Sequence, residues 1–299
     1  MSLPVIRNGK FHAGAHLRCG ENVVIDVSEE VVIGERCTLP DNAYLSGRRI
    51  TIGDDFYGMS WGHPAPDPAY LRDHDSPTGS WLEIGRGRRD EEDAVLMVGN
   101  RCTFHDNRID LSRCVDIGDD VGLSPAVVIY THHYWLSPFH GYPCRYDTVS
   151  IGSGSIIGFR SVVLPGTRLG RATVIGAQSV VSGYLIGNRT YGGNPIRLIK
   201  RSIAEMTLGQ KHVFLHDLMN NYRRSLEYRG YHEVMSSLFT DFPVVHFQGC
   251  VFNLETFERN GEENDYTDDL RDYLFKHGFR FYTNRPFHKL GRSLSELPV

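Results

Sequence analysis

The segment from His132 to Asp147, HHYWLSPFHGYPCRYD, has the residue types best suited to acid–base chemistry in this chain. It follows the apolar run Ala126–Tyr130 and precedes Ile151-Gly152. A histidine can accept a proton near neutral pH, and a poor nucleophile such as a hydroxyl must lose its proton during attack. His132 and His133 are therefore both candidates for a general base.

The element that must position these histidines is a repeat of six residues. An aliphatic residue followed by Gly recurs through the first 200 residues, with successive intervals from Ile151 of 6, 12, 6 and 11, and with two earlier intervals of 19. Helices repeat at 3.6 residues and alternating strands at 2, so this period indicates short strands separated by regular turns. The aliphatic residue would point inward, and the Gly would permit a corner where a Cβ would clash. The sequence predicts a β solenoid.

Residues 151–200 resemble the hexapeptide-repeat acyltransferases, whose fold is a left-handed parallel β-helix. The shared pieces are Pro165-Gly166, Ile175-Gly176-Ala177, Gly193-Asn194-Pro195 and Arg197. The resemblance covers roughly residues 22–200. It implies the handedness of the coil, acetyl-CoA as the acyl donor, a carbohydrate acceptor, and a homotrimer with each active site between two subunits.

The interruption at residues 132–147 resembles the active-site loop of the sugar and antibiotic O-acetyltransferases in this family. That loop follows a strand that ends in a catalytic His, and Ile129-Tyr130-Thr131-His132 matches the strand end. The match favours His132 over His133 as the general base, although a shift of one residue would reverse the choice.

One coil earlier, the family often has an Asn or Asp that contacts or orients the acceptor. The resemblance favours Asn107 for this role, with His105 and Asp106 as alternatives, while a turn cap is the structural interpretation of Asn107. Three residues of the loop could line the acceptor pocket or simply pack: Trp135, His140 and Tyr142.

The family lays CoA along the coils that follow the catalytic loop. The positions that match its pantetheine contacts are Gly158, Phe159, Ala177 and Ser182. Basic residues after the coil would meet the phosphates of CoA, and Arg197 and Lys200 match them. A surface charge is the alternative for Arg197. The resemblance implies no metal.

Composition divides the chain near residue 200. The first 200 residues hold 25 of the 31 Gly, whereas 16 of the 33 aromatic residues follow residue 200. We therefore predict a mainly β protein: a left-handed β-helix domain over 1–200, with inserted loops at about 57–81 and 132–147, and a small α/β domain over 201–299.

The predicted elements of the second domain follow from hydrophobic spacing and turn residues. They are an amphipathic helix through Phe214–Leu226, strands at Val244–Gln248 and Cys250–Phe257, a polar turn at Glu258–Asp265, a helix at Asp268–His277 and a strand at Phe279–Thr283. Cys250, Phe252 and Leu254 are expected to point inward.

Composition also excludes several classes. The net charge of −4 is spread evenly, which disfavours nucleic-acid binding. No leader segment and no transmembrane run is visible, so we expect a cytoplasmic protein. The six cysteines contain no CxxC pair and are expected to be free thiols.

The predicted function is acetyl-CoA-dependent transfer to a sugar hydroxyl of a surface polysaccharide or its precursor, directly and without an acyl-enzyme. N-acetylation of an amino or nucleotide sugar is the alternative within the family. A zinc-dependent lyase of the carbonic anhydrase type shares the solenoid, but its third His is absent here. A non-catalytic scaffold is a further alternative. The acceptor and the length of the acyl group stay open.

Overall fold

A computed structural model describes residues 3–59, 82–85, 90–201 and 204–291. The chain divides into two compact units, residues 1–203 and residues 204–299, and each is described by itself. Most of the inserted loop predicted at 57–81 lies outside the described residues.

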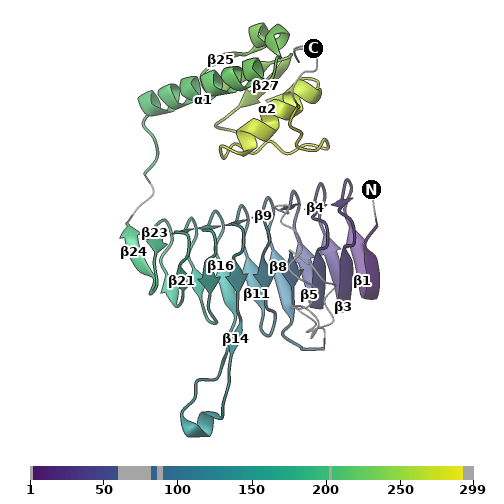
Figure 1. Cartoon of the computed structure of the whole chain (residues 1–299), viewed down its shortest axis with the longest axis vertical. Coiled ribbons are helices and arrows are strands. Elements are labelled where there is room, and N and C mark those ends of the chain that lie inside the picture. Colours follow the sequence, from purple (N-terminus) through teal and green to yellow (C-terminus); the bar gives the residue numbers. More distant parts are fainter. Residues whose placement is uncertain (1–2, 60–81, 86–89, 202–203, 292–299) are drawn as a thin grey trace, which may run out of the picture. The chain divides into compact units, whose positions relative to one another are not determined.

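The first unit is a parallel β-helix of the left-handed type, as the sequence predicted (Figure 1). Successive coils run over three faces, and each strand pairs in parallel with its counterpart one coil away. Face 1 holds β8 (Val95–Val98), β11 (Val115–Ile117), β16 (Val149–Ile151), β19 (Arg168–Leu169) and β22 (Tyr184–Leu185). Face 2 holds β2 (Arg18–Cys19), β4 (Thr38–Leu39), β6 (Tyr57–Gly58), β9 (Thr103–Phe104), β12 (Gly122–Leu123), β17 (Ile156–Ile157), β20 (Val174–Ile175) and β23 (Thr190–Gly192). Face 3 holds β7 (Glu83–Ile84), β10 (Arg108–Ile109), β13 (Val128–Ile129), β18 (Val162–Val163) and β21 (Val180–Val181).

The first coils join faces 3 and 1 through long strands. These are β1 (Val5–Ala13), β3 (Val24–Ile33) and β5 (Tyr44–Ile52). The start of β5 pairs with β7 on face 3, and its end pairs with β8 on face 1, so a single strand bends around the corner. At the C-terminal end of the β-helix, β24 (Arg197–Lys200) pairs antiparallel with β23, so the last strand of this sheet runs opposite to the others.

Inward aliphatic side chains hold the coils in register. At the end of face 1, one buried column runs from coil to coil through paired positions: Ile33, Ile52, Val98, Ile117, Ile151, Leu169 and Leu185. Burying such a side chain contributes about 1.5–3 kcal/mol. Because every member touches the next, the column fixes the stagger of all the coils together.

The glycine after each column member is required by close approach between coils. A Cβ on Gly99 would lie 2.4 Å from Asp119 Oδ1 and 2.6 Å from the Asp119 nitrogen. Directly after this Gly, side chains cap the neighbouring coil: the backbone N–H of Asn100 donates to Asp119 Oδ1 at 2.7 Å, and that of Asp54 donates to Asn100 Oδ1 at 2.8 Å. The backbone N–H groups at the corner therefore have hydrogen-bond acceptors even though they are outside a strand pairing.

The second unit packs two helices and a four-stranded antiparallel sheet around its own core. Its elements are α1 (Leu208–Tyr228), η3 (His232–Ser237), β25 (Phe239–Asp241), β26 (Val244–Phe247), β27 (Cys250–Asn253), β28 (Arg259–Asn260) and α2 (Asp265–Phe275). Thr207 begins α1 with a capping box that pairs it with Gln210. No helix within the described ranges is long and apolar enough to cross a membrane.

Two expectations for this unit were wrong. The predicted polar turn at Glu258–Asp265 contains β28, which completes the sheet. The predicted strand at Phe279–Thr283 is irregular, because the segment is held by side chains instead of a sheet neighbour: Phe281 is buried and its carbonyl accepts from Arg271 at 3.2 Å. Cys250, Phe252 and Leu254 are buried, as predicted.

The close approach of coils at Gly99 can be tested by Gly99→Ala. The added methyl would meet Asp119 backbone, and such overpacking typically costs about 1–3 kcal/mol. We expect a lower melting temperature for the first unit in scanning calorimetry. Gly209→Ala is the matched control, because Gly209 lies in α1 with no atom within 4 Å of the added Cβ. The control should melt at the wild-type temperature or above it. Equal melting of wild type and Gly99→Ala would contradict the packing argument.

Candidate active site

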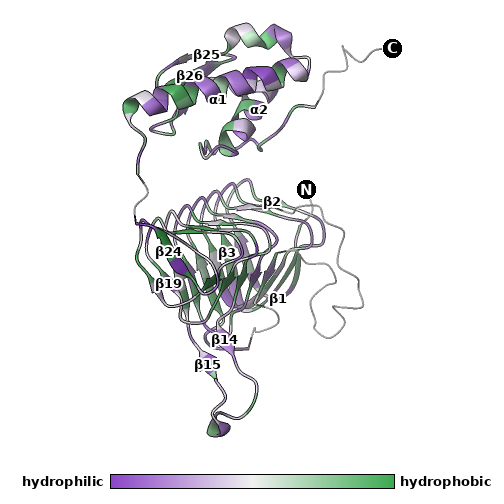
Figure 2. Ribbon diagram, turned by 60° about the vertical axis from the view of Figure 1, so that its left-hand side comes forward, coloured by the Kyte–Doolittle hydropathy of each residue, from purple (hydrophilic) through white to green (hydrophobic). Residues whose placement is uncertain are grey.

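A hairpin interrupts the coil between faces 3 and 1 and projects from it (Figures 1 and 2). Its base is formed by β14 (His132–His133) and β15 (Arg145–Tyr146), which pair antiparallel with His132 opposite Tyr146. A single 3-10 turn, η2 (Pro138–His140), closes its far end. His132 therefore lies where the hairpin leaves the coil.

His132 is bonded to a carboxylate from the preceding coil. Its Nδ1 lies 2.7 Å from Asp110 Oδ2, and the two side chains are only 21% and 11% exposed. Asp110 follows β10 and His132 comes three residues after β13, and the register pairs Ile109 with Ile129. The stacking of two coils thus brings together residues that are 22 positions apart.

The surroundings of Asp110 favour its ionised form. Burial raises the pKa of this carboxyl, but hydrogen bonds from Thr131 and His132 outweigh burial and hold the pKa below its ordinary value. Thr131 donates to Oδ2 from its backbone nitrogen at 3.0 Å and from its hydroxyl. An ionised carboxylate only accepts hydrogen bonds, so Nδ1 of His132 is the donor. The neutral ring then carries its lone pair on Nε2, which is the arrangement of a general base.

Ser112 completes a Ser, His, Asp cluster that cannot act as a nucleophilic triad. Its hydroxyl lies 2.8 Å from Nδ1 of His132, the same nitrogen that Asp110 contacts, and the residue is fully buried. In a nucleophilic triad the serine and the carboxylate bond opposite nitrogens of the ring. Here both side chains contact Nδ1, so the cluster lacks the arrangement of such a triad.

Aromatic rings flank His132 at the base of the hairpin. The imidazole stacks on Tyr146 with centroids 5.6 Å apart and an angle of 21°, and Tyr134 lies at the same centroid distance. The Arg113 guanidinium covers Tyr146 at 5.0 Å and pairs with Asp93 at 3.4 Å. These contacts restrain the ring on its exposed side. Sequence reasoning did not select Tyr134 or Tyr146.

The structure distinguishes the two neighbouring histidines. His133 is exposed and lies opposite Arg145 in the hairpin, on the other side of the strand from His132. Its partner Arg145 bonds Asp147 at 2.8 Å. Only His132 joins the Asp110 cluster.

Asn107 forms hydrogen bonds within the coil, and its predicted contact with the acceptor stays a prediction. It is fully buried inside the coil, where its amide donates to the Ser124 carbonyl at 2.9 Å and accepts from the His105 backbone nitrogen at 2.7 Å. With these bonds the side chain links the turn after β9 to the next coil, and it is not available to a ligand in solvent. These hydrogen bonds correspond to the interpretation of Asn107 as a turn cap.

His105 and Asp106 lie at the corner between faces 2 and 3, whereas His132 lies at the corner between faces 3 and 1. Burial lowers the pKa of His105, which favours its neutral form. The two predicted alternatives to Asn107 are therefore not brought to His132 within one chain.

The three loop residues proposed for the acceptor pocket lie beyond the base of the hairpin. Trp135 is 83% exposed, Tyr142 is 44% exposed, and His140 belongs to the 3-10 turn at the tip. None of them contacts His132 among the described interactions, whereas Tyr134 and Tyr146 do.

The residues predicted to bind CoA occupy successive coils toward the end of the β-helix. Gly158 and Phe159 follow β17, and Ala177 follows β20, at the corner between faces 2 and 3; a Cβ on Gly158 would lie 2.5 Å from the Ala177 nitrogen. Ser182 follows β21 at the corner of His132, two coils further on. Arg197 and Lys200 are exposed on β24. Gly158, Phe159 and Ala177 thus lie at the opposite edge of face 3 from His132, whereas Ser182 lies at the same edge as His132.

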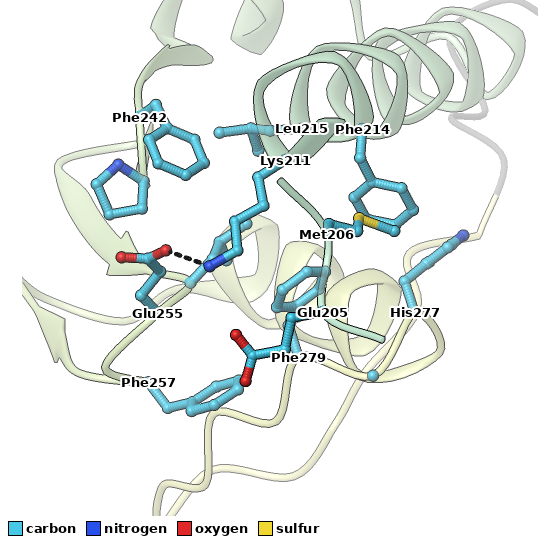
Figure 3. A pocket seen from close by; sticks show the side chains of 13 residues that line it. Glu205, Met206, Lys211, Phe214, Leu215, Phe242, Glu255, Phe257, His277 and Phe279 are labelled. Atoms are coloured by element: carbon cyan, nitrogen blue, oxygen red, sulfur yellow. Dashed lines mark hydrogen bonds and ion pairs between the residues drawn. The ribbon is translucent and has the colours of Figure 1, made fainter. Parts of the chain in front are cut away.

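The second unit carries a separate recess of about 720 Å³. Figure 3 shows its lining of aromatic side chains, with the ion pair between Lys211 and Glu255 at 2.8 Å. The lining residues are Glu205, Met206, Lys211, Phe214, Leu215, Phe242, Pro243, Leu254, Glu255, Phe257, His277, Gly278 and Phe279. The recess contains none of the predicted site residues.

Over the ranges that the structure describes, no three His, Cys, Asp or Glu side chains converge as metal ligands.

The repeat and the coil together define the first unit as a hexapeptide-repeat β-helix of the left-handed type. Comparison with known proteins adds a specific similarity. Over 65 residues the chain is 40% identical to an Escherichia coli (strain K12) protein named as a lipopolysaccharide biosynthesis O-acetyl transferase, WbbJ; the match covers 22% of this chain and 33% of that protein. The chain therefore matches about a third of the length of this relative. No protein-family model matches the chain.

Two solved structures that are similar to parts of this chain are named as O-acetyltransferases. The maltose O-acetyltransferase from Clostridium difficile 630 is 26% identical, with 50% of this chain and 69% of that chain covered and a TM-score of 0.37. The polysialic acid O-acetyltransferase OatWY is 15% identical, with 69% and 95% covered and a TM-score of 0.47.

The lowered pKa of Asp110 predicts a pH-dependent contribution to stability. A carboxyl whose pKa is lower in the folded chain stabilises that chain above its unfolded pKa, about 3.9 for Asp, and loses this contribution as the pH falls through the folded value. Asp110→Asn should therefore lower the free energy of unfolding at pH 6, and the gap to wild type should narrow below about pH 4. All three Trp precede residue 200, so denaturant titration followed by Trp fluorescence reports on the first unit. A gap that widens as the pH falls would contradict the assignment.

Proposed function

We propose that the chain is an acetyl-CoA-dependent O-acetyltransferase that acts on a sugar hydroxyl, with His132 as the general base. The observation that carries the proposal is the bond between Asp110 and Nδ1 of His132, which leaves the lone pair on Nε2. The partial match to WbbJ supports a saccharide of the cell surface, or its precursor, as the acceptor. We also propose that the reaction takes place in the cytoplasm.

The proposed reaction is a single displacement. Nε2 of His132 accepts the proton of the acceptor hydroxyl. At the same time, the hydroxyl oxygen forms a bond to the carbonyl carbon of the thioester. The resulting imidazolium is stabilised by the ionised Asp110, since opposite charges at hydrogen-bond distance attract strongly when partly buried. Collapse of the tetrahedral intermediate breaks the carbon–sulfur bond, and the proton on Nε2 passes to the CoA thiolate. The proton balance needs no second acid.

Tyr134 and Tyr146 are proposed as the acceptor platform. Their rings lie 5.9 Å apart at an angle of 12°. The His132 imidazole stacks on Tyr146 and meets Tyr134 at a tilt of 34°. Tyr134 is 55% exposed and Tyr146 is 37% exposed, so each retains an accessible surface beside the base. A sugar presents apolar C–H groups to such a surface and hydroxyls at its edge, which can place one hydroxyl near Nε2.

The donor is proposed to bind across two copies of the chain in a homotrimer. Ala177 and Arg197 are exposed, and a small residue and a cation suit the pantetheine arm and the phosphates of CoA. They lie on faces and corners other than the one that holds His132. A cyclic assembly can bring the His132 corner of one copy to the donor corner of the next, because its interfaces join two different surfaces.

Replacing the base tests the proposal directly. His132→Gln should lower kcat for transfer of acetyl from acetyl-CoA by about 10²–10⁴-fold, the usual contribution of a general base. Thioester consumption across a panel of sugars and oligosaccharides measures it. His133→Gln is the matched control, and it should keep most of the wild-type rate because its side chain is exposed and does not contact Asp110. Full transfer by His132→Gln would overturn the proposal.

Subunit mixing tests the shared site. His132→Gln and Ala177→Trp should each be inactive alone, the second because the indole would fill the donor surface. In mixed trimers, an intact base from one variant can face an intact donor surface from the other, and random assembly would restore about a quarter of the sites. Activity of the co-expressed variants is the measurement. No recovery in confirmed mixed trimers would show that each site lies within one chain.

A further inference from the structure

Ser112 is a buried hydroxyl placed between the two members of the catalytic pair. It is fully buried, and its Oγ lies 3.0 Å from Asp110 Oδ1 and 2.8 Å from Nδ1 of His132. Asp110 is an ionised acceptor, so the hydroxyl proton of Ser112 is donated to Oδ1. The same oxygen can then accept part of the Nδ1–H bond from His132.

The two oxygens of Asp110 are held from different directions. Thr131 and His132 bond Oδ2, whereas Ser112 bonds Oδ1. A carboxylate that is bonded at one oxygen can rotate about its Cβ–Cγ bond, and rotation would move Oδ2 away from the imidazole. The bond at Oδ1 opposes that rotation.

The direction of the Ser112 hydroxyl also bears on the tautomer of His132. If the ring proton moved to Nε2, the bare Nδ1 would face the carboxylate, and Ser112 would have to turn its proton toward Nδ1. Donation to Oδ1 keeps that proton away from the ring. The carboxylate and the serine oxygen then both accept from Nδ1–H, and neither can support the unproductive tautomer.

We infer that Ser112 is a positioning residue that acts through Asp110 to hold His132 in the Nδ1–H tautomer, with Nε2 free to accept a proton. The inference rests on the proposed function for its kinetic consequence, but the tautomer itself can be observed without any substrate. Ser112 does not touch the reacting atoms, because it lies on the Nδ1 side of the ring.

The test compares wild type with Ser112→Ala by NMR of ring-¹⁵N histidine in the full chain, at a pH above the ordinary His pKa. The His132 signals are assigned from their loss in His132→Gln. Wild type should show a protonated Nδ1 and an unprotonated Nε2, and Ser112→Ala should show averaging between the two tautomers. In transfer assays, kcat should fall about 2–10-fold, as for the loss of one hydrogen bond, with KM for acetyl-CoA unchanged. Ser112→Thr keeps the hydroxyl and should restore both readouts.

A second buried serine provides a control that distinguishes a positioning role from a general effect on stability. Ser155 donates to the Gly170 carbonyl at 3.4 Å and accepts from the Thr173 backbone at 3.1 Å, far in sequence from the Asp110 cluster. Ser155→Ala should lower the melting temperature and leave the His132 nitrogen signals in place. If Ser112→Ala does not fold, Ser112→Cys replaces it, since a thiol is a weak donor of similar size.

The outcomes separate this inference from the proposed function. Wild-type nitrogen signals and wild-type kcat in Ser112→Ala would overturn the role of Ser112. A shifted tautomer in a chain that transfers acetyl to no acceptor would support the positioning role and overturn the proposed transferase.

Discussion

The register between successive coils is the constraint on which the rest of the first unit depends. The column from Ile33 to Leu185 fixes it from inside, and Gly99 with its counterparts lets the backbones approach closely enough for Asp and Asn side chains to cap the next coil. A slip of one residue in a strand would turn its inward side chains outward. It would also separate Asp110 from His132, because these residues belong to different coils and meet only through the pairing of Ile109 with Ile129.

This dependence explains how a short loop can hold the proposed base, His132, in a fixed position. The hairpin itself contributes few buried contacts, and its tip is exposed. His132 is held at the root, where the buried Thr131 and the carboxylate of Asp110 attach it to the coil and where Tyr146 with Arg113 covers the ring. The rigid coil supplies positioning, and the projecting hairpin supplies an accessible surface. Binding sites are commonly built in this way, on loops held by a scaffold.

Much of the fold was predictable because a six-residue period has few structural solutions. The sequence also favoured His132 over His133, since His132 follows a recognisable strand end, and its role as the base stays a proposal. Asp110 and Ser112 were missed, although a signal exists: aligning Ile109 with Ile129 places them one coil before Tyr130 and His132. The hydrogen bonds that hold Asn107 inside the coil could not be predicted, because the direction of a side chain at a turn cannot be judged from its type. In the second unit, tertiary contacts overrode the local pattern at Phe279–Thr283.

A double-mutant cycle on kcat can show whether Asp110 and His132 act as one unit. Asp110→Ala, His132→Ala and the double variant would be compared with wild type for acetyl transfer to the same acceptor. When two residues act through each other, the effects of their substitutions on the rate do not add. If Asp110 acts through His132, the double variant should transfer acetyl at the same rate as His132→Ala alone. A double variant slower than His132→Ala by the full factor lost in Asp110→Ala would contradict it.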